Sequence, residues 1–185
     1  MLRTADRLAL ADLVHIYASA VDDRRFDDVA ELFTENAELR LPEPPRSLEP
    51  VRNHHGRDGV RAAMASLAAV TRTEHAIVGE VYAAADERDY ALGRITCIAH
   101  HWTISDGQPS DLVWHLRYDD EYLRTRAGWR IHGRALTINA IETRPVRRLR
   151  LPPSDGPPGS ADPSTAWTEP VPRKTNRPGR FRETP

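Results

Sequence analysis

Residues 6–33, DRLALADLVHIYASAVDDRRFDDVAELF, decide the fold of this chain. Apolar residues recur there at spacings of three and four, which places one buried face on a helix; they are Leu10, Leu13, Val14, Tyr17, Ala20 and Val21. A second short helix follows, and Asp27 and Asp28 suit its first turn, where carboxylates complement free N–H groups and the helix dipole. Tyr17 and Asp22 therefore lie where two helices meet, a place at which a pocket can open.

Length and composition narrow the possible classes of protein. A chain of 185 residues is long enough for one domain with a substantial core and some excess. The formal net charge of -1 argues against nucleic acid or an anionic membrane as a partner. Cys97 is the only cysteine, which excludes internal disulfides and multi-cysteine metal motifs and suits a reducing cytoplasm. The charged N-terminus resembles neither a signal peptide nor a membrane span, so we expect a cytoplasmic protein.

The segment after the two helices predicts a strand, a loop and a third helix. Ala37 to Leu41 alternates between apolar and polar residues as an exposed strand does. Four prolines between Pro42 and His55 predict an irregular lid or rim, because proline removes a hydrogen-bond donor. A third helix then follows in GRDGVRAAMASLAAV, residues 56–70, with Asp58 as the expected N-cap.

From Thr71 onward the apolar period changes from helical to alternating. Four strands are predicted, at His75–Tyr82, Tyr90–Thr103, Leu112–Arg124 and Trp129–Ile141. The short links between them carry turn residues and favour antiparallel hairpins. Strands of this length favour a strongly bent sheet that the preceding helices cover on one face. The fold class predicted from the sequence is therefore α+β.

The composition changes near residue 145. Residues 145–185 hold ten of the fifteen prolines and almost no periodic apolar residues, so they bury too little surface to offset the entropy of ordering. We therefore expect a folded domain at 1–144 and a Pro/Arg-rich, disordered or surface-draped tail at 145–185. The alternative is a docking segment, in which Trp167 and Phe181 are the expected anchors.

Two histidine positions are candidates for chemistry. His75 opens a strand and can point between sheet and helices, where a carboxylate from Asp22 would fix its tautomer and raise its basicity. Along the next strand, parity places His101 inside and His100 outside, unless a bulge reverses the faces. A metal site of His75, His101 and Asp22 is conceivable, but no tight ligand motif is present, so we expect no metal and no cofactor.

Aromatic residues and one arginine complete the candidate site. A pocket lined by aromatic residues would suit an aromatic or polycyclic substrate, although such residues are also ordinary in a core; they are Tyr17, Phe33, Trp102, Trp114 and Tyr118. Simple alternation along Trp129-Arg130-Ile131-His132-Gly133 leaves Arg134 on the solvated face.

The order of these motifs resembles the SnoaL-like branch of the NTF2-like superfamily, over about residues 5 to 143. The resemblance rests on IYASAVDDRRFDDVAELFTENAEL at 16–39, GRDGV at 56–60, TEHAIVGE at 73–80, IAHHW at 98–102 and YDDEYLRTRAGWRIHGRAL at 118–136. It implies a cone-shaped curved antiparallel sheet packed on three N-terminal helices, with a deep pocket and often a homodimer, or a homotrimer. We therefore expect a small-molecule substrate and a homo-oligomer.

The resemblance also implies roles for individual residues. Scytalone dehydratase, bile acid 7α-dehydratase and hexachlorocyclohexane dehydrochlorinase share this fold and perform cofactor-free eliminations with a histidine base held by an aspartate. By motif, His75 is the base and Asp22 its partner, and Tyr17, His101 and Arg134 face the pocket. For Arg134 this contradicts the parity prediction, and a bulge after Gly133 would reconcile the two. The expected activity is a dehydratase-type elimination, or an isomerisation, in secondary metabolism; the alternatives are a polyketide cyclase or epoxide hydrolase, or a non-catalytic binding or dimerisation module.

Overall fold

Three α-helices, a 3₁₀ helix and six strands make up residues 1–151, the part of the chain that this computed structural model describes. In chain order they are α1 (Thr4–Asp22), α2 (Phe26–Glu31), β1 (Phe33–Glu43), β2 (Ser47–His55), α3 (Gly56–Ala65), the 3₁₀ helix η1 (Ser66–Ala69), β3 (Arg72–Ala84), β4 (Tyr90–Ser105), β5 (Gln108–Thr125) and β6 (Gly128–Pro145). The predicted tail anchors Trp167 and Phe181 lie outside the described residues.

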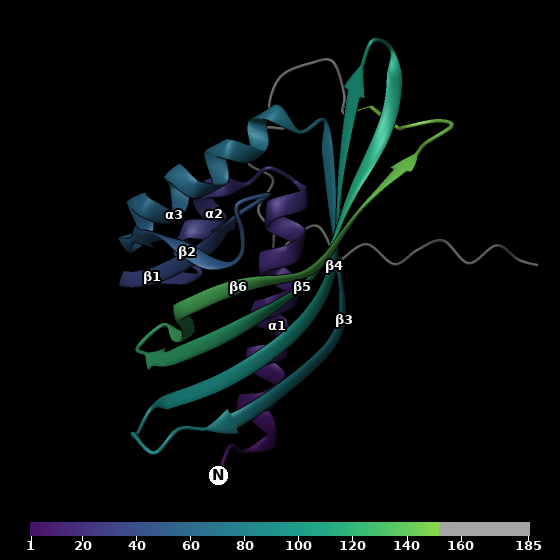
Figure 1. Ribbon diagram of the computed structural model, residues 1–185. Coiled ribbons are helices and arrows are strands. Elements are labelled where there is room, and N and C mark those ends of the chain that lie inside the picture. The colour runs from purple at the N-terminus through teal and green to yellow at the C-terminus, as the bar shows by residue number, and fades with distance from the viewer. Residues whose placement is uncertain (152–185) are drawn as a thin grey trace, which may run out of the picture. The chain divides into compact units, whose positions relative to one another are not determined.

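The strands form one curved sheet in the order β2-β1-β6-β5-β4-β3, and α1 lies against one of its faces (Figure 1). The four long strands β3 to β6 are joined by antiparallel hairpins, as the turn residues predict. The α+β class is therefore confirmed. The sheet is antiparallel except in one place, where β1 pairs with β6 in parallel, with Leu39 opposite Arg134.

The proline-rich segment from Pro42 to His55 is a hairpin and not the irregular loop expected. Residues 47–55 form β2, which pairs antiparallel with β1 from His55 opposite Glu38 to Arg52 opposite Leu41. Since β2 is the edge of the sheet, Pro50 need not supply a donor to a second neighbour. The sequence pattern failed here because proline excludes central strands but not edge strands.

The third helix begins at Gly56, two residues before the expected cap Asp58. Gly56 has a φ of 66°, and a Cβ at this position would lie 2.9 Å from the carbonyl oxygen of Glu35. Only glycine fits such a left-handed position without strain. Asp58 instead lies in the first turn, where its carboxylate accepts a hydrogen bond from Arg61 at 2.8 Å.

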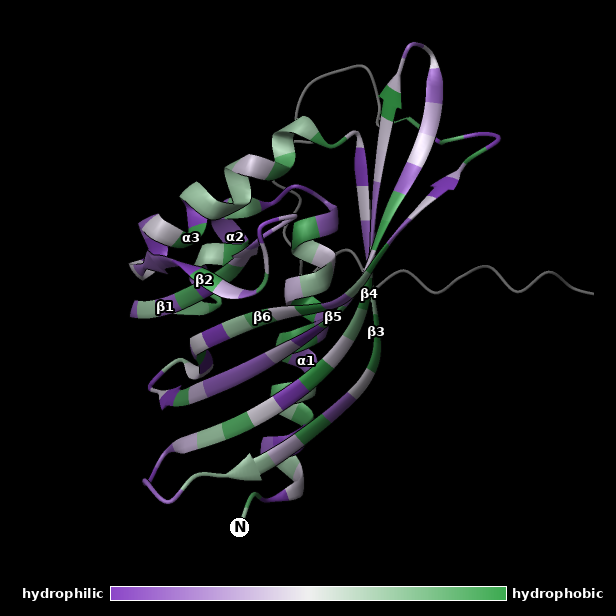
Figure 2. Cartoon of the chain, in the orientation of Figure 1, coloured by the Kyte–Doolittle hydropathy of each residue, from purple (hydrophilic) through white to green (hydrophobic). Residues whose placement is uncertain are grey.

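The core lies between α1 and the sheet. The predicted apolar face of α1 is buried, and hydropathy alternates along the strands that face it (Figure 2). Tyr17 of α1 contacts Phe33 and Tyr118 edge to face, with ring centroids 6.2 and 6.1 Å apart. These contacts tie the helix to strands β1 and β5, so the position of Tyr17 is fixed by packing from two sides.

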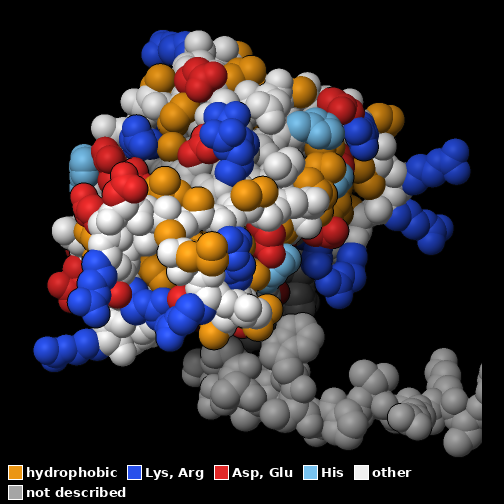
Figure 3. Space-filling model, turned by 90° about the horizontal axis from the view of Figure 1, so that it is seen from below, with side chains coloured by type: hydrophobic (Ala, Val, Ile, Leu, Met, Phe, Trp, Pro, Cys, Tyr) orange, Lys and Arg blue, Asp and Glu red, His pale blue; other side chains and the backbone are white. Residues whose placement is uncertain are grey.

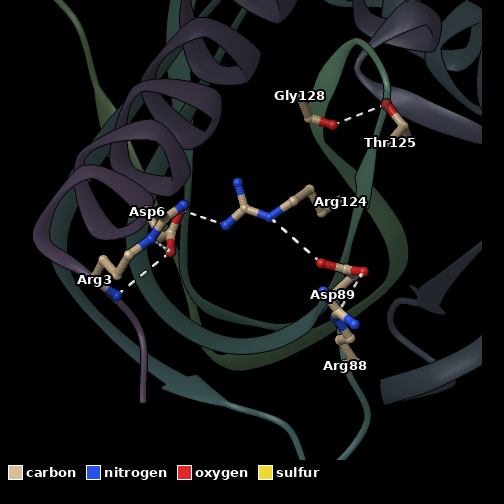
Figure 4. Close-up of polar contacts among 7 residues, drawn as sticks. All are labelled: Arg3, Asp6, Arg88, Asp89, Arg124, Thr125 and Gly128. Carbon is tan, nitrogen blue, oxygen red and sulfur yellow. Dashed lines mark hydrogen bonds and ion pairs between the residues drawn. The ribbon is translucent and has the colours of Figure 1, made fainter.

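A cluster of charges fixes the N-terminal end of α1 to the sheet (Figure 4). Asp6 is buried and accepts hydrogen bonds from Arg3 and from Arg124 of β5. Arg124 also lies 3.8 Å from the carboxylate of Asp89 and 4.3 Å from the ring centroid of Trp129. The hydrogen bonds from Arg3 and Arg124 hold the pKa of Asp6 well below its usual range.

The surface is mixed in charge. Figure 3 shows acidic and basic side chains interspersed with hydrophobic ones on the face seen from below. Within residues 1–151 there is no helix with the length and apolar character needed to cross a membrane.

Candidate active site

Asp22 and His75 are in direct contact where α1 ends and β3 begins. The ring Nδ1 of His75 lies 2.7 Å from Oδ1 of Asp22, and the backbone N–H of His75 donates to Oδ2 at 2.8 Å. Burial would raise the pKa of Asp22, but the hydrogen bond and the charge of His75 outweigh it, so the pKa lies below its ordinary value. An ionised carboxylate accepts and does not donate, so Nδ1 carries the proton and Nε2 keeps its lone pair.

His101 and Trp114 lie beside this pair, which we call the dyad. The rings of His75 and His101 are 6.1 Å apart, and the rings of His101 and Trp114 are 4.7 Å apart. Only 8% of the side chain of His75 and 22% of that of Asp22 is exposed. The dyad is therefore largely buried, and Asp22 is its more exposed member.

The environment of His101 fixes its protonation. Its Nδ1 lies 3.1 Å from the carbonyl oxygen of Leu112, which can only accept, so Nδ1 is the donor. Burial lowers the pKa of His101 to about 4. At neutral pH its Nε2 therefore carries no proton, which argues against His101 as a proton donor.

Parity along β4 places His101 and His100 on opposite faces. His101 is 6% exposed and faces the helices, whereas Nδ1 of His100, on the outer face, lies 2.7 Å from Oδ2 of Asp111. Trp102 stacks on His100 with ring centroids 5.2 Å apart and planes inclined by 10°. Trp102 therefore lies across the strand from His101, and the prediction that it lines a pocket with the dyad is wrong, because it shares the parity of His100.

Arg134 is buried, so the solvated position predicted by alternation is wrong. In the pairing of β5 with β6, Glu121 is opposite Gly133 and Tyr122 is opposite Ile131, which leaves His132 without a partner. This bulge inverts the parity of the residues that follow it, as far as the second register shift between Ile138 and Ala140. It lies before Gly133, one position earlier than the resemblance suggested, and it turns Arg134 toward the helices.

Arg134 and Asp120 form an ion pair inside the domain. Nε and Nη2 of Arg134 donate to the two carboxylate oxygens of Asp120 at 2.8 and 2.7 Å, and neither side chain is exposed. The guanidinium also lies 4.1 Å from the ring centroid of Tyr17 and 4.3 Å from that of Tyr118. The pair with Asp120 raises the pKa of Arg134 well above its ordinary value even though burial opposes this.

The predicted site residues therefore fall into two groups. The first contains the dyad with His101 and Trp114, and the second contains Tyr17, Phe33, Tyr118 and Arg134. Within residues 1–151 no hydrogen bond joins the two groups. Sequence reasoning missed Asp120, whose signal was its position two residues from both Tyr118 and Tyr122 on one strand face.

Burial raises the pKa of Tyr17, so its phenol stays protonated.

Two surface hollows lie away from the dyad. One, of about 300 Å³, is lined by Asn36, Glu38, Arg40, His55, Glu121, His132 and Gly133. The other, of about 370 Å³, lies over the hairpin between β3 and β4 and is lined by Ala84, Ala85, Asp86, Glu87, Tyr90, Leu92 and Glu121. Neither hollow contains a residue that the sequence predicted for the site.

His75, His101 and Asp22 are not arranged as metal ligands. Among residues 1–151, no group of three or more histidine, cysteine, aspartate or glutamate side chains is placed to hold a metal ion. The ring nitrogen Nδ1 of each of the two histidines is engaged, by Asp22 and by the Leu112 carbonyl. What the dyad itself offers is an oriented imidazole with a free Nε2, the arrangement of a proton acceptor.

The sequence matches the family model of the SnoaL-like domain over residues 2–135. An uncharacterised protein of Mycobacterium tuberculosis, Rv2910c, is 29% identical over 145 residues, which cover 78% of this chain and 89% of that protein. The suspected resemblance is therefore confirmed at the level of the family.

Two solved structures place the fold among known ones. A candidate aromatic ring hydroxylase of Novosphingobium aromaticivorans has a TM-score of 0.66 and 25% identity, and the match covers 78% of this chain and 96% of that one. A type 2 hexachlorocyclohexane dehydrochlorinase, LinA, has a TM-score of 0.62 and 18% identity, with 81% of this chain and 95% of that one covered. At this identity the second match shows a common fold.

Proposed function

Because the chain belongs to the SnoaL-like domain family, we propose that it is a cofactor-independent lyase in which His75, oriented by Asp22, removes a proton from carbon. The observation that carries the proposal is the pair of contacts from Asp22 to His75, at 2.7 Å to the ring and 2.8 Å to the backbone. They fix the rotamer and the tautomer of the imidazole at once. An oriented histidine with a carboxylate partner is the usual proton acceptor near neutral pH.

The reaction begins with transfer of a proton to Nε2 of His75. The proton comes from a carbon next to a carbonyl group, and the electron pair of the C–H bond becomes the new double bond. The C–O bond to a hydroxyl on the neighbouring carbon breaks, and the hydroxyl departs as water after receiving a proton. The products are an unsaturated carbonyl compound and water, so no oxidant or cofactor is consumed.

His75 itself is the best donor for the departing hydroxyl. After the first step its ring is doubly protonated, and the charge of Asp22 stabilises that imidazolium. His101 has no proton on Nε2 at neutral pH, and Tyr17 packs with Arg134 in the other group. One residue that accepts the proton and returns it leaves the enzyme unchanged after each turnover.

A binding module is the second candidate function. It is favoured by the position of the two hollows, neither of which includes the dyad, and by the interior that Arg134, Tyr17 and Tyr118 fill. A cyclase or an epoxide hydrolase would use the same fold, but no contact of the described residues favours either over elimination. Because of the geometry of the dyad, we therefore favour the lyase over the binding module, the cyclase and the epoxide hydrolase.

The proposal is tested with a panel of β-hydroxy carbonyl compounds, aromatic and polycyclic members included, by following the absorbance of the unsaturated product. We expect turnover by the wild-type protein and a loss of about 10²–10⁴-fold in His75→Gln. Circular dichroism and the thermal midpoint establish that the variant is folded. Equal rates in the two proteins would remove His75 as the base, and binding without product across the panel would favour the binding module.

A further inference from the structure

Arg24 lies at the same place in the fold as the dyad. It follows Asp22 by two residues in the link between α1 and α2 and has a φ of 61°, which few residues other than glycine adopt. Its Nη2 donates to the carbonyl oxygen of Val70 at 2.9 Å, two residues before β3 begins. The side chain thus spans from the end of α1 to the start of the strand that carries His75.

The guanidinium of Arg24 has no counter-ion among residues 1–151. Its one hydrogen bond goes to a neutral carbonyl, and its Nη1 is buried without a partner. The nearby carboxylate of Asp22 is already engaged by His75. Partial burial and the charge of Arg72 lower the pKa of Arg24, and the charge of Asp22 opposes this, so the cation is partly desolvated and close to the dyad. A half-buried guanidinium with one unpartnered nitrogen suits an anionic ligand.

One further donor in this region lacks a partner. Nε1 of Trp114 is buried and unbonded, and the Trp114 ring is tilted against that of His101. Thr73, which is paired across the ladder with His101, interacts through its hydroxyl with the carboxylate of Asp22 and helps to lower the pKa of Asp22. Nη1 of Arg24 and Nε1 of Trp114 are therefore two buried donors of this region without a partner among residues 1–151. Unpaired buried donors are costly unless a ligand supplies acceptors.

Arg134, the cation that the resemblance places in the pocket, is already neutralised. It forms two hydrogen bonds with Asp120 and packs between two tyrosine rings. A second anion there would compete with a carboxylate that has no exposure to solvent. Arg24 and Arg72 both lie near His75 without an ion pair among residues 1–151, and Arg24 is the one with a buried, unpartnered Nη1.

We propose that the substrate of the dyad carries a carboxylate, which Arg24 binds while His75 acts on a neighbouring carbon. This inference rests on the proposed lyase function and names its substrate class. Arg24 is then a specificity-determining residue, since a neutral analogue would leave its charge unpaired. A carboxylate accepts hydrogen bonds from two donors at once, and Arg is the side chain whose geometry matches it best.

The test uses benzoate and its neutral isostere benzamide as probes, with NMR of the imidazole Cε1–H signals as the readout. The His75 signal is assigned with His75→Gln. We expect benzoate to shift it at a concentration at least about tenfold lower than benzamide does, since one charge-assisted contact distinguishes the two probes. Arg24→Gln abolishes this preference. Arg25→Gln is the matched control, because Arg25 is adjacent in the chain but pairs with Asp28 at 2.6 Å.

Equal response to the two probes, no response at His75, or a preference that survives in Arg24→Gln would each overturn the inference. Arg24→Lys keeps the charge, and retention of the preference in this variant supports the inference even if Arg24→Gln folds poorly. The readout is independent of turnover. A failed lyase proposal shows as absent product with the benzoate preference intact, whereas failure of this inference shows as turnover without that preference.

Discussion

Asp22 holds His75 through both of its carboxylate oxygens, one on the ring at 2.7 Å and one on the backbone N–H at 2.8 Å. The backbone contact fixes where β3 starts relative to α1, and the ring contact fixes the tautomer of the imidazole. A single carboxylate therefore links the fold of the domain to the chemistry proposed for it.

Asp22→Asn is expected to lower the turnover number by about 10²–10⁴-fold, because an amide does not hold the proton on Nδ1 or stabilise the imidazolium. Steady-state rates on the panel substrate with the highest wild-type turnover measure this. The control is Asp23→Asn, since the side chain of Asp23 is exposed and its ion pair within residues 1–151 is with Arg25, at 3.6 Å. A similar loss in both variants would assign the effect to the fold of this region and not to the dyad.

Because burial lowers the pKa of His101, we expect the domain to lose stability in mild acid. Its pKa is about 4 in the folded protein against an ordinary value of 6.5, so the unfolded chain binds the proton more tightly. The stabilisation that comes from keeping His101 neutral is complete above pH 6.5 and is lost as the pH falls from there toward about 4. The difference between the two pKa values corresponds to roughly 3 kcal/mol of unfolding free energy. Urea unfolding of His101→Phe at a series of pH values should show a flatter slope over this window than the wild type, and an unchanged slope would contradict it.

Asp120→Asn should destabilise the domain by about 3–5 kcal/mol, because it leaves the charge of Arg134 buried without its partner. The free energy of unfolding in urea measures this. The exposed ion pair of Arg94 with Asp119, at 2.9 Å, is the matched control. Arg94→Met removes this pair and should lower the free energy of unfolding by less than about 1 kcal/mol. Equal losses of unfolding free energy in the two variants would show that the buried pair contributes no more to stability than the exposed one.

The contact between Asp6 and Arg124 predicts a second acid effect at lower pH. Because the pKa of Asp6 is held below its ordinary value of 3.8, its contribution is present above that value and is lost as the pH falls further. In Arg124→Gln the thermal midpoint should fall at neutral pH and approach that of the wild type in strong acid. A difference that does not depend on pH would mean that Arg124 acts through its packing on Trp129 alone.

The sequence predicted elements with local signals well and long-range pairings poorly. The apolar face of α1 and the hairpins from β3 to β6 follow from periodicity and turn residues, which act over a few positions. The parallel pairing of β1 with β6 joins residues such as Leu39 and Arg134, far apart in the chain, and no local pattern specifies it. The edge strand β2 was not predicted from the sequence, because Pro50 is unfavourable in most strands.

For the candidate site, parity worked wherever the ladder is regular. It placed His101 inside and His100 outside along β4, whose pairing with β5 has no bulge. It failed for Arg134 because one unpaired residue, His132, reverses the faces of the strand. The contact of Asp22 with His75 joins a helix end to a strand start, and the sequence suggested it through residue type and through the motifs of the family resemblance.

The most direct measurement is the tautomer of the neutral imidazole ring of His75. A long-range proton–nitrogen correlation spectrum of the ring, assigned with His75→Gln, reports which nitrogen carries the proton. We predict a proton on Nδ1 in the wild-type protein and its redistribution to Nε2 in Asp22→Asn. A wild-type ring with its proton on Nε2 would contradict the account, because no lone pair would then remain to accept a proton from substrate.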